Sequence, residues 1–157
     1  MEKTTNRTLN ELLVNLFHNV MDIEAEAVIT EEFRDITNND MHIIEAIGND
    51  EPRSMSVIAK SLNITVGTLT TNMNSLEDKK YILRERSQTD KRVVLVKLTE
   101  KGRKAFFHHR DFHRRMIHSI VKDLEEDEMK VLIRCLQNLT RFFDEQNDKK
   151  TKRQTSL

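Results

Sequence analysis

The stretch "SVIAKSLNITVGTLTTNMNSLEDKKYILRERSQTDKRVVLVKLT", Ser56 to Thr99, decides the fold, because it puts two short helical patterns directly before two β-branched runs. A turn near "LNIT" separates the helical patterns, and the polar residues "QTDK" separate the runs "YILRERS" and "RVVLVKL". Two helices joined by a short turn form a known compact unit, and two β runs around a polar turn predict a hairpin. The stretch therefore predicts a helix-turn-helix followed by a two-stranded wing.

Long amphipathic patterns flank this stretch. Apolar residues recur with a helical period over residues 8–29, where Thr8 to Glu11 resembles a capping box at the helix start. A short helix is expected after caps at Thr37 to Asn39, and two more long helical patterns follow Thr99. Three Gly and one Pro among 157 residues also indicate a helical chain. We expect a mainly α fold with a small β-hairpin wing.

The domain organisation follows from the apolar faces of the long helices. Residues 8–30 and 100–147 are too apolar on one face to remain single in water, so they should pair with each other and with a second chain. We therefore expect a single domain over residues 1–157. In it, a winged helix-turn-helix region at residues 37–98 lies between long dimerisation helices.

Composition bears on several protein classes. The chain has 26 basic and 26 acidic residues, so only the distribution of charge, and not its total, can indicate a nucleic-acid partner. The single cysteine, Cys135, cannot form an intrachain disulfide, and no signal peptide or membrane span is recognisable. No phosphate-binding loop or nucleophile motif is present. We expect a cytoplasmic protein that is not an enzyme, requires no cofactor and contacts no membrane.

The second short helix is the candidate for reading DNA bases. Its buried face should carry Leu69, Met73 and Leu76, and its opposite face carries small hydroxyl and amide side chains with no acidic residue before Glu77. Such side chains fit against base edges, and Val or Thr methyl groups can contact thymine methyls. The alternative is a threonine-rich exposed helix of any small domain. The expected contact residues are Thr65, Val66, Gly67, Thr70, Thr71 and Asn74.

The hairpin is the candidate for a second DNA contact. Arginine suits a phosphate track or a narrow minor groove, where the negative potential is enhanced. Asp90 is unfavourable beside phosphates unless it accepts hydrogen bonds from Arg92 and orients that guanidinium. The alternative is an ordinary surface pair worth under about 1 kcal/mol. The expected contact residues of the wing are Arg84, Arg86, Asp90, Lys91 and Arg92.

Residues Ser56 to Arg103 resemble the MarR family of bacterial winged-helix regulators. The pattern Asp-x-Arg, then an apolar strand and Leu98-Thr99, is the wing signature of that family, and the flanking helices extend the similarity to roughly residues 8–145. Within the family, "TVGTLTTNMNSLEDKKYI" and "MHIIEAIG" are most similar to repressors of the FabT type, which control fatty-acid synthesis. The resemblance implies a homodimer on a palindromic operator, with long-chain acyl–acyl-carrier protein as corepressor.

The chain has six histidines, and two of them, His109 and His113, share a helix face. Some MarR relatives are zinc sensors that use such a pair, and this resemblance implies a site made of Glu24, His42, His109 and His113. Those sensors also use a cysteine after the first helix, where this chain has residues 30–32, Thr-Glu-Glu. The alternative is a hydrogen-bonded polar cluster or pocket lining without a metal.

An acyl chain requires a long apolar slot. Candidate wall residues occur where the first, second and fifth helices should meet: Phe17, Phe33, Met41, Ile44, Phe106, Phe112 and Met116, with His42, His109 and His113 beside them. The alternative is that these residues form only the core and dimer interface. Acyl-carrier protein is acidic, so its dock should be basic. Candidate dock residues are Arg34, Arg110, Arg114 and Arg115.

Three hypotheses therefore stand beside one another. The first is a repressor of the FabT type with acyl-carrier protein as corepressor, and the second is a zinc-responsive repressor of the MarR type. The third is a helical interaction adaptor with no role on DNA. The adaptor predicts no salt-dependent DNA binding, which separates it from the other two.

Overall fold

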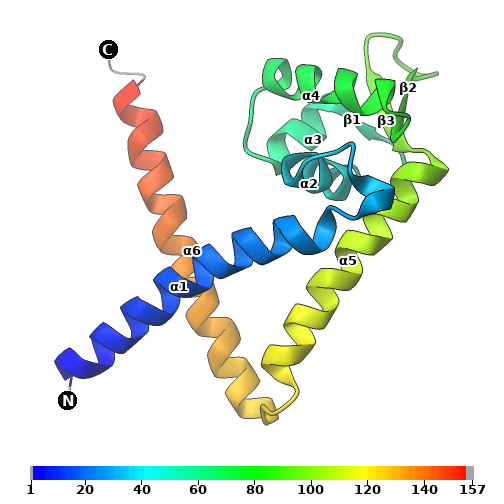
Figure 1. The fold of residues 1–157 in the computed structure, drawn as a ribbon. Helices are drawn as coiled ribbons and strands as arrows, with labels where there is room; N and C mark the ends of the chain where they lie inside the picture. The colour runs from blue at the N-terminus through cyan, green and yellow to red at the C-terminus, as the bar shows by residue number, and fades with distance from the viewer. Residues whose placement is uncertain (1, 155–157) are drawn as a thin grey trace. The chain divides into compact units, whose positions relative to one another are not determined.

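A computed structural model describes the backbone of residues 2–154 and the side chains of residues 4–146 except 21, 25 and 28. The elements follow one another in the order α1 (Glu2–Val28), η1 (Glu31–Phe33), α2 (Asn38–Ile47), β1 (Arg53–Ser54), α3 (Met55–Ser61), α4 (Val66–Asp78), β2 (Ile82–Arg86), β3 (Val94–Leu98), α5 (Glu100–Val121) and α6 (Glu126–Gln154). Figure 1 shows this order by colour. The chain is mainly α with one small sheet, as predicted.

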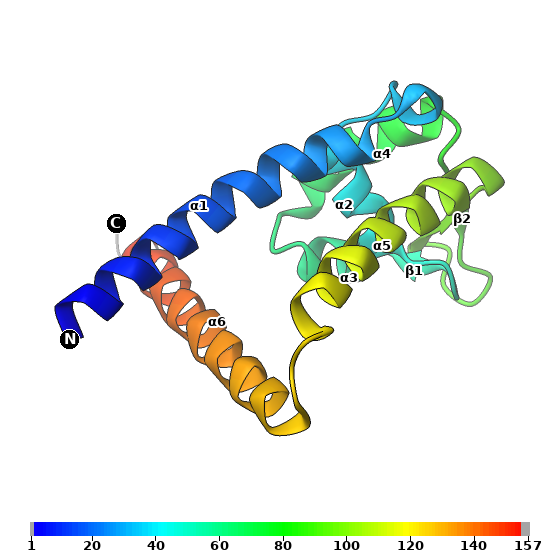
Figure 2. The same cartoon turned by 60° about the horizontal axis from the view of Figure 1, so that its bottom comes forward.

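The chain divides into two compact units, Met1–Arg114 and Arg115–Leu157, and the division falls inside α5. The first unit contains the predicted helix-turn-helix and wing. In it, α2, α3 and α4 gather beside the sheet (Figure 1, Figure 2). The second unit consists of the end of α5, a short turn and α6.

Polar side chains cap three helices of the first unit, and the first of them confirms the predicted cap at Thr37. Thr37 accepts a hydrogen bond from the Asp40 backbone N–H and Asp40 reciprocates, which completes a capping box at α2. Thr65 Oγ1 accepts from the Thr68 backbone N–H at 3.1 Å and so caps α4. Thr99 Oγ1 accepts from Gly102 N–H at 3.1 Å and caps α5. Short polar residues at these positions fix where each helix begins.

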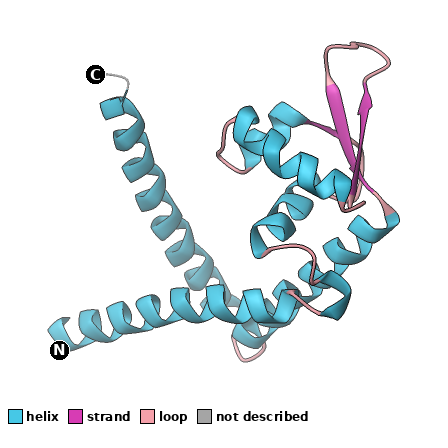
Figure 3. Cartoon of the chain, turned by 45° about the horizontal axis from the view of Figure 1, so that its top comes forward, coloured by secondary structure: helices cyan, strands magenta, loops and turns pink. Residues whose placement is uncertain are grey.

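The sheet is antiparallel, with strand order β1-β3-β2. β2 and β3 pair from Ile82 with Leu98 to Arg86 with Val94, and they project beyond the helices as a two-stranded arm (Figure 3). This arm is the predicted hairpin. β1 was not predicted, because a two-residue strand carries no alternation, and it forms only by pairing with Leu95 and Val96 of β3.

One hydrophobic core holds the first unit together. Leu69, Met73 and Leu76 are fully buried, which confirms the predicted inner face of α4. The core continues through α2, α3 and the sheet with Phe33, Ile36, Met41, Ile43, Ile44, Ile47, Ile58, Ala59, Tyr81, Ile82, Val96, Leu98 and Ala105. The recognition-helix candidate is therefore anchored along one whole side.

The turn from α4 into β2 takes three residues. Lys79 ends the helix, Lys80 has φ +66°, and the Tyr81 N–H donates to Leu76 O at 2.9 Å. The Tyr81 carbonyl then accepts from Thr99 N–H at 3.0 Å and lies against Gly102, where an added Cβ would be 2.0 Å from the carbonyl oxygen. Only glycine fits at this crossing of α5 with the turn.

The long helices differ in two details from the prediction. The first begins at Glu2, so Thr8 is not its cap, and Thr8 Oγ1 donates to Thr4 O inside the helix. Residues 2–7 contain no Gly or Pro, so nothing in them stops the helix. Cys135 is exposed on α6, although a free cysteine is usually a small buried apolar residue. Among the described residues, no helix is both long and apolar enough to cross a membrane.

Candidate nucleic-acid interface and polar cluster

The outer side of α4 is open to solvent along its whole length. Each predicted contact residue of the helix is exposed: Thr65, Val66, Gly67, Thr70, Thr71 and Asn74. Two threonine hydroxyls are engaged locally, since Thr70 Oγ1 donates to Val66 O at 2.7 Å and Thr65 Oγ1 lies 2.9 Å from Thr68 Oγ1. A Cβ at Gly67 would meet only Thr65 Oγ1, at 3.7 Å, so the fold itself does not require glycine there.

The wing tip has the expected orienting contact. Arg92 Nε donates to Asp90 Oδ1 and Arg92 Nη2 to Asp90 Oδ2, both at 3.1 Å, and the Arg92 backbone N–H donates to Asp90 Oδ1 at 3.0 Å. These hydrogen bonds hold the pKa of the Asp90 carboxyl below its ordinary value. The Arg92 side chain is 91% exposed, so a bidentate fork orients a guanidinium that faces water. Lys91 and Arg86 are exposed near it.

A hollow of about 400 Å³ joins the helix to the wing. Val66 and Thr70 line it from α4, and Arg84 and Arg92 line it from the hairpin. Ser54, Met55, Ser56, Val93 and Val94 complete the lining. The hollow thus brings together four of the predicted contact residues, whereas Thr65, Gly67, Thr71, Asn74, Arg86, Asp90 and Lys91 lie outside its lining.

Arg84 has a partner that the sequence did not reveal. Glu77, at the end of α4, accepts hydrogen bonds from Arg84 Nη2 and, at 2.9 Å, from Arg84 Nε. The Arg84 backbone N–H also points at Glu77 Oε1, at 3.3 Å. The hydrogen bonds from Arg84 keep the pKa of Glu77 below its ordinary value, although burial opposes this. No pattern in the sequence indicates this pair, because it crosses the turn between α4 and β2.

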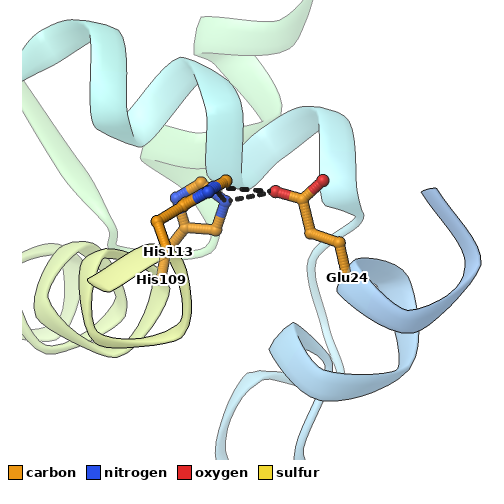
Figure 4. Close-up of side chains that lie close together, drawn as sticks. All are labelled: Glu24, His109 and His113. Atoms are coloured by element: carbon orange, nitrogen blue, oxygen red, sulfur yellow. Dashed lines mark hydrogen bonds and ion pairs between the residues drawn. The ribbon is translucent and has the colours of Figure 1, made fainter. Parts of the chain in front are cut away.

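A second site of interest lies where α1, α2 and α5 meet in the first unit. Glu24 is 2% exposed and faces the imidazole rings of His109 and His113 (Figure 4). Glu24 Oε1 is 2.8 Å from His109 Nε2 and 3.0 Å from His113 Nε2, and the two Nε2 atoms are 3.1 Å apart. His42 approaches from α2, with Nε2 at 3.8 Å from Glu24 Oε2. The structure therefore groups three of the four suggested residues, Glu24, His109 and His113, whereas His42 forms a neighbouring group with Glu45 and His109.

Burial and hydrogen bonding set the protonation of this cluster. Burial alone would raise the pKa of Glu24, but the hydrogen bond from His109 and the nearby histidines outweigh it, so that pKa lies below its ordinary value. Burial lowers the pKa of His109 against the opposing effect of Glu24. His109 Nδ1 makes no hydrogen bond with the described residues, and Glu45 Oε2 is 3.5 Å from it.

The chain is similar to known transcriptional regulators over most of its length. The family model of the transcriptional regulators SarA/Rot matches residues 27–109, which span the first unit from the end of α1 to α5. The solved structure of Streptococcus pneumoniae FabT in complex with DNA is similar over 89% of this chain and 98% of that chain, at 38% identity and a TM-score of 0.80. The chain belongs to the SarA/Rot family of transcriptional regulators, among the MarR-type winged-helix proteins.

The chain is also similar to two more distant proteins, the second of which shows the fold alone. The transcriptional regulator PchR of Bacillus subtilis strain 168 is 24% identical over 94% of this chain and 95% of its own length. A MarR-family transcription regulator of known structure shares the fold at a TM-score of 0.73 with 14% identity, over 92% of this chain and 93% of that chain. The family model and the similarity to FabT show that the chain is a DNA-binding transcriptional regulator of the winged-helix type and not an enzyme.

The candidate residues for an effector pocket are distributed unevenly in this SarA/Rot-family chain. Phe33, Met41 and Ile44 are buried in the core, whereas Phe106, Phe112 and Met116 on α5 are only partly covered. Phe17 of α1 is 56% exposed. Phe33 also contacts His108, with ring centroids 5.2 Å apart. The core members of the set therefore have a structural role whether or not a ligand binds beside them.

The candidate dock residues Arg34, Arg110, Arg114 and Arg115 are all at the surface. Arg110 lies over the rings of Phe106 and Phe107, at 5.5 and 4.7 Å from their centroids, and Arg114 pairs with Asp111 at 3.3 Å. Arg115 belongs to the second unit. Three of the four thus lie on α5, and one of them, Arg110, lies over aromatic side chains.

Proposed function

We propose that this chain is a homodimeric repressor of fatty-acid-synthesis genes, which binds a palindromic operator and takes long-chain acyl–acyl-carrier protein as its corepressor. One observation carries the proposal. The whole winged-helix region, including the hollow lined by Val66, Thr70, Arg84 and Arg92, lies in a chain 38% identical to FabT, which was crystallised with DNA. The target genes and corepressor come from the FabT-type resemblance.

We propose that α4 and the wing of β2 and β3 both contact DNA. α4 offers neutral hydroxyl, amide and methyl groups suited to base edges in the major groove. Arg92 offers a guanidinium suited to phosphate or to a narrow minor groove. Because both line one hollow, a single duplex can be contacted by helix and wing together.

The homodimer is supported by apolar side chains that the chain leaves uncovered. On α1 these are Leu9, Leu12, Leu13, Val14, Leu16, Phe17 and Ile23, and on α6 they are Val131, Ile133, Leu136, Phe142 and Phe143. An open apolar hollow of about 610 Å³ in the second unit adds Ile120, Leu124, Leu132 and Cys135. Exposed apolar surface of this extent favours a second copy as partner. Two-fold symmetry would set two recognition helices about 34 Å apart.

The corepressor is proposed to act through an equilibrium between two arrangements of the dimer. A ligand strengthens DNA binding only if it binds the DNA-competent arrangement more tightly than the other. The arginines on α5 suit an acidic carrier protein, and the partly covered Phe106, Phe112 and Met116 suit the acyl chain that it carries. This assignment also locates the protein in the cytoplasm, with the DNA that it binds.

The test is an electrophoretic shift with DNA upstream of the chain's own gene and of fatty-acid-synthesis genes. The titration is run without ligand, with long-chain acyl–acyl-carrier protein, and with carrier protein lacking the acyl group. The expected result is sequence-specific binding that the acylated carrier tightens and the unacylated carrier does not. Absence of salt-dependent DNA binding would contradict the repressor, and binding indifferent to the acylated carrier would contradict the corepressor.

A zinc-responsive repressor is the second candidate, and one observation favours it. Glu24 Oε1, His109 Nε2 and His113 Nε2 converge within 3.1 Å of one another. A tetrahedral zinc ion at about 2.0–2.1 Å from each ligand would need these atoms only slightly farther apart. His42 groups instead with Glu45 and His109, so it does not complete this set in the structure. Without an ion, Glu24 Oε1 and the Nε2 atoms of His109 and His113 must share the few hydrogens available between them. The donor set therefore fits zinc.

Metal analysis of the purified protein and operator titrations with a chelator separate the two candidates. The zinc model predicts bound metal, loss of operator binding in chelator, and the same loss in a His113→Gln variant. Operator binding that survives the chelator and tightens with the acylated carrier eliminates the zinc model.

A further inference from the structure

Glu77 is an acidic residue in an unexpected position, because it lies in the recognition helix of a DNA-binding protein. Its carboxylate is about one-third exposed, and it binds Arg84, which lines the hollow between helix and wing. An acidic group here weakens binding to phosphates through simple electrostatics. Its presence therefore needs a compensating role.

Glu77 accepts hydrogen bonds from Arg84 of β2, and these suggest the compensating role. β2 is an edge strand, because the strand order is β1-β3-β2. Edge strands carry backbone N–H groups that no neighbouring strand satisfies. Glu77 Oε1 accepts from one of these, the Arg84 N–H at 3.3 Å, while Glu77 Oε2 accepts from Nε and Nη2 of the same residue. One carboxylate thus binds both the backbone and the side chain of the wing strand.

The contact also bridges the two parts that must reach one duplex. Between Glu77 and Arg84 the chain passes through the tight turn at Lys79 and Lys80, which has no other side-chain link to the middle of β2 among the described residues. On the far side of the strand, Arg84 pairs with Val96 of β3, so the whole hairpin follows the position of Arg84. The carboxylate therefore controls the angle between α4 and the wing.

We propose that Glu77 is a positioning residue for DNA recognition, which fixes Arg84 and the wing strand against the recognition helix so that both address the same duplex. The inference rests on the proposed DNA interface and adds a specificity role to it. Glu77 does not contact DNA in this account. It orients Arg84 so that Nη1, which makes no hydrogen bond with the described residues, remains available to a phosphate.

The proposal makes a prediction opposite in sign to simple electrostatics. A Glu77→Ala variant removes a negative charge from the surface that faces phosphates, so affinity for a scrambled duplex should be unchanged or tighter. Affinity for the operator should nevertheless fall by about tenfold or more, the size expected for losing hydrogen bonds to a charged group. The ratio of operator affinity to scrambled affinity is therefore the quantity to measure.

The experiment measures fluorescence anisotropy of the operator fragment and of a scrambled fragment with full-length wild type, Glu77→Ala, Glu77→Gln and Asp78→Ala. Asp78 is the exposed neighbour on the same helix end, so its variant is the matched charge control and should keep the wild-type ratio. Glu77→Gln keeps one acceptor oxygen and should lie between wild type and Glu77→Ala. An Arg84→Ala, Glu77→Ala double variant should be no worse than Arg84→Ala alone.

Each outcome decides the proposal. The proposal is overturned if Glu77→Ala keeps the wild-type ratio of operator affinity to scrambled-duplex affinity. It is also overturned if that variant loses affinity equally for both duplexes. If Glu77→Ala does not fold, Glu77→Gln carries the test, and an unchanged ratio in that variant overturns the proposal. Failure of the wild type to prefer any operator would instead contradict the proposed function, so the two failures are distinguishable.

Discussion

The helix-turn-helix region and the long terminal helices bury their apolar side chains to very different extents. In the first, Leu69, Met73 and Leu76 have no exposed surface. In the second, Leu12 of α1 is 61% exposed and Leu136 of α6 is 54% exposed. Periodicity is equally regular in both regions. One region completes its core within a single chain, whereas the other leaves apolar side chains exposed, which the proposed homodimer would cover.

The largest expected effect is a loss of stability in the helix-turn-helix region, where α5 crosses the turn after α4 most closely. Gly102→Ala would put a Cβ 2.0 Å from the Tyr81 carbonyl oxygen, and neither backbone can yield cheaply. We expect a loss of about 3 kcal/mol or more in the free energy of unfolding, measured by urea denaturation. Gly67→Ala is the matched control, since its Cβ has space, and it should gain up to about 1 kcal/mol. Equal stability of the two variants would refute this picture of the crossing.

A pair of leucine substitutions tests the comparison itself. Leu69→Ala should cost about 2–5 kcal/mol at any protein concentration, because it opens a cavity in a core made by one chain. Leu12→Ala should leave that core intact. It should instead raise the dimer dissociation constant by about tenfold or more, because the proposed dimer interface loses one leucine from each protomer. Sedimentation velocity over a range of concentrations reads the second effect. A Leu12 variant that dimerises like wild type would contradict the role given to α1.

A smaller effect, a gain in folding stability, is expected at the turn that joins the recognition helix to the wing. Lys80 has φ +66°, a left-handed conformation that strains a residue with a side chain. Lys80→Gly should therefore stabilise the folded state by about 1 kcal/mol, read as a rise in Tm. Lys79→Gly, at φ −77°, is the control and should destabilise or leave Tm unchanged. A lower Tm for Lys80→Gly would mean that the turn is not strained.

The smallest effect concerns the exposed ion pair that ties residue 35 to α5. Burial would raise the pKa of Asp35, but hydrogen bonds from Lys101 at 2.7 Å and from Tyr81 at 2.6 Å hold it below its ordinary value. A lowered pKa stabilises the fold above about pH 4, the ordinary value, and the contribution disappears as pH falls through the folded-state pKa.

Thermal unfolding between pH 3 and pH 6 measures this contribution. Wild type should exceed Asp35→Asn in the free energy of unfolding by under about 1 kcal/mol at pH 6, as for other exposed pairs, and this difference should shrink as pH falls toward 3. A difference that grows as pH falls would have the wrong sign for this account.

The sequence predicted most of the first unit because its signals are local. Thr65 and Thr99 mark helix starts by their own side chains, and the period of Leu69, Met73 and Leu76 marks a buried face. β1 was missed, since its two residues become a strand only by pairing with β3, about forty residues later. The start of α1 was misjudged because a capping pattern near Thr8 also fits a helix interior.

The candidate sites were predictable to a smaller extent. The Asp90 fork on Arg92 spans two residues, so its geometry followed from the motif. The Glu77 contact with Arg84 crosses a turn whose shape depends on Lys80, and no pattern in the sequence indicates it. The convergence of Glu24 with His109 was suggested by resemblance, because 85 residues separate them and only the packing of α1 on α5 brings them together. The contacts that were missed depend on how separated parts of the chain pack together, which a local pattern in the sequence does not show.

The most direct measurement of the central claim, that helix and wing bind one duplex, is the salt dependence of operator affinity for wild type and Arg92→Ala. Wild type should lose affinity steeply with salt. Arg92→Ala should bind about tenfold or more weakly, with a slope of log affinity against log salt shallower by about 1 for each protomer. Asp90→Asn, which loosens the fork but keeps the cation, should fall between them. An Arg92→Ala variant with the affinity and slope of wild type would contradict the account.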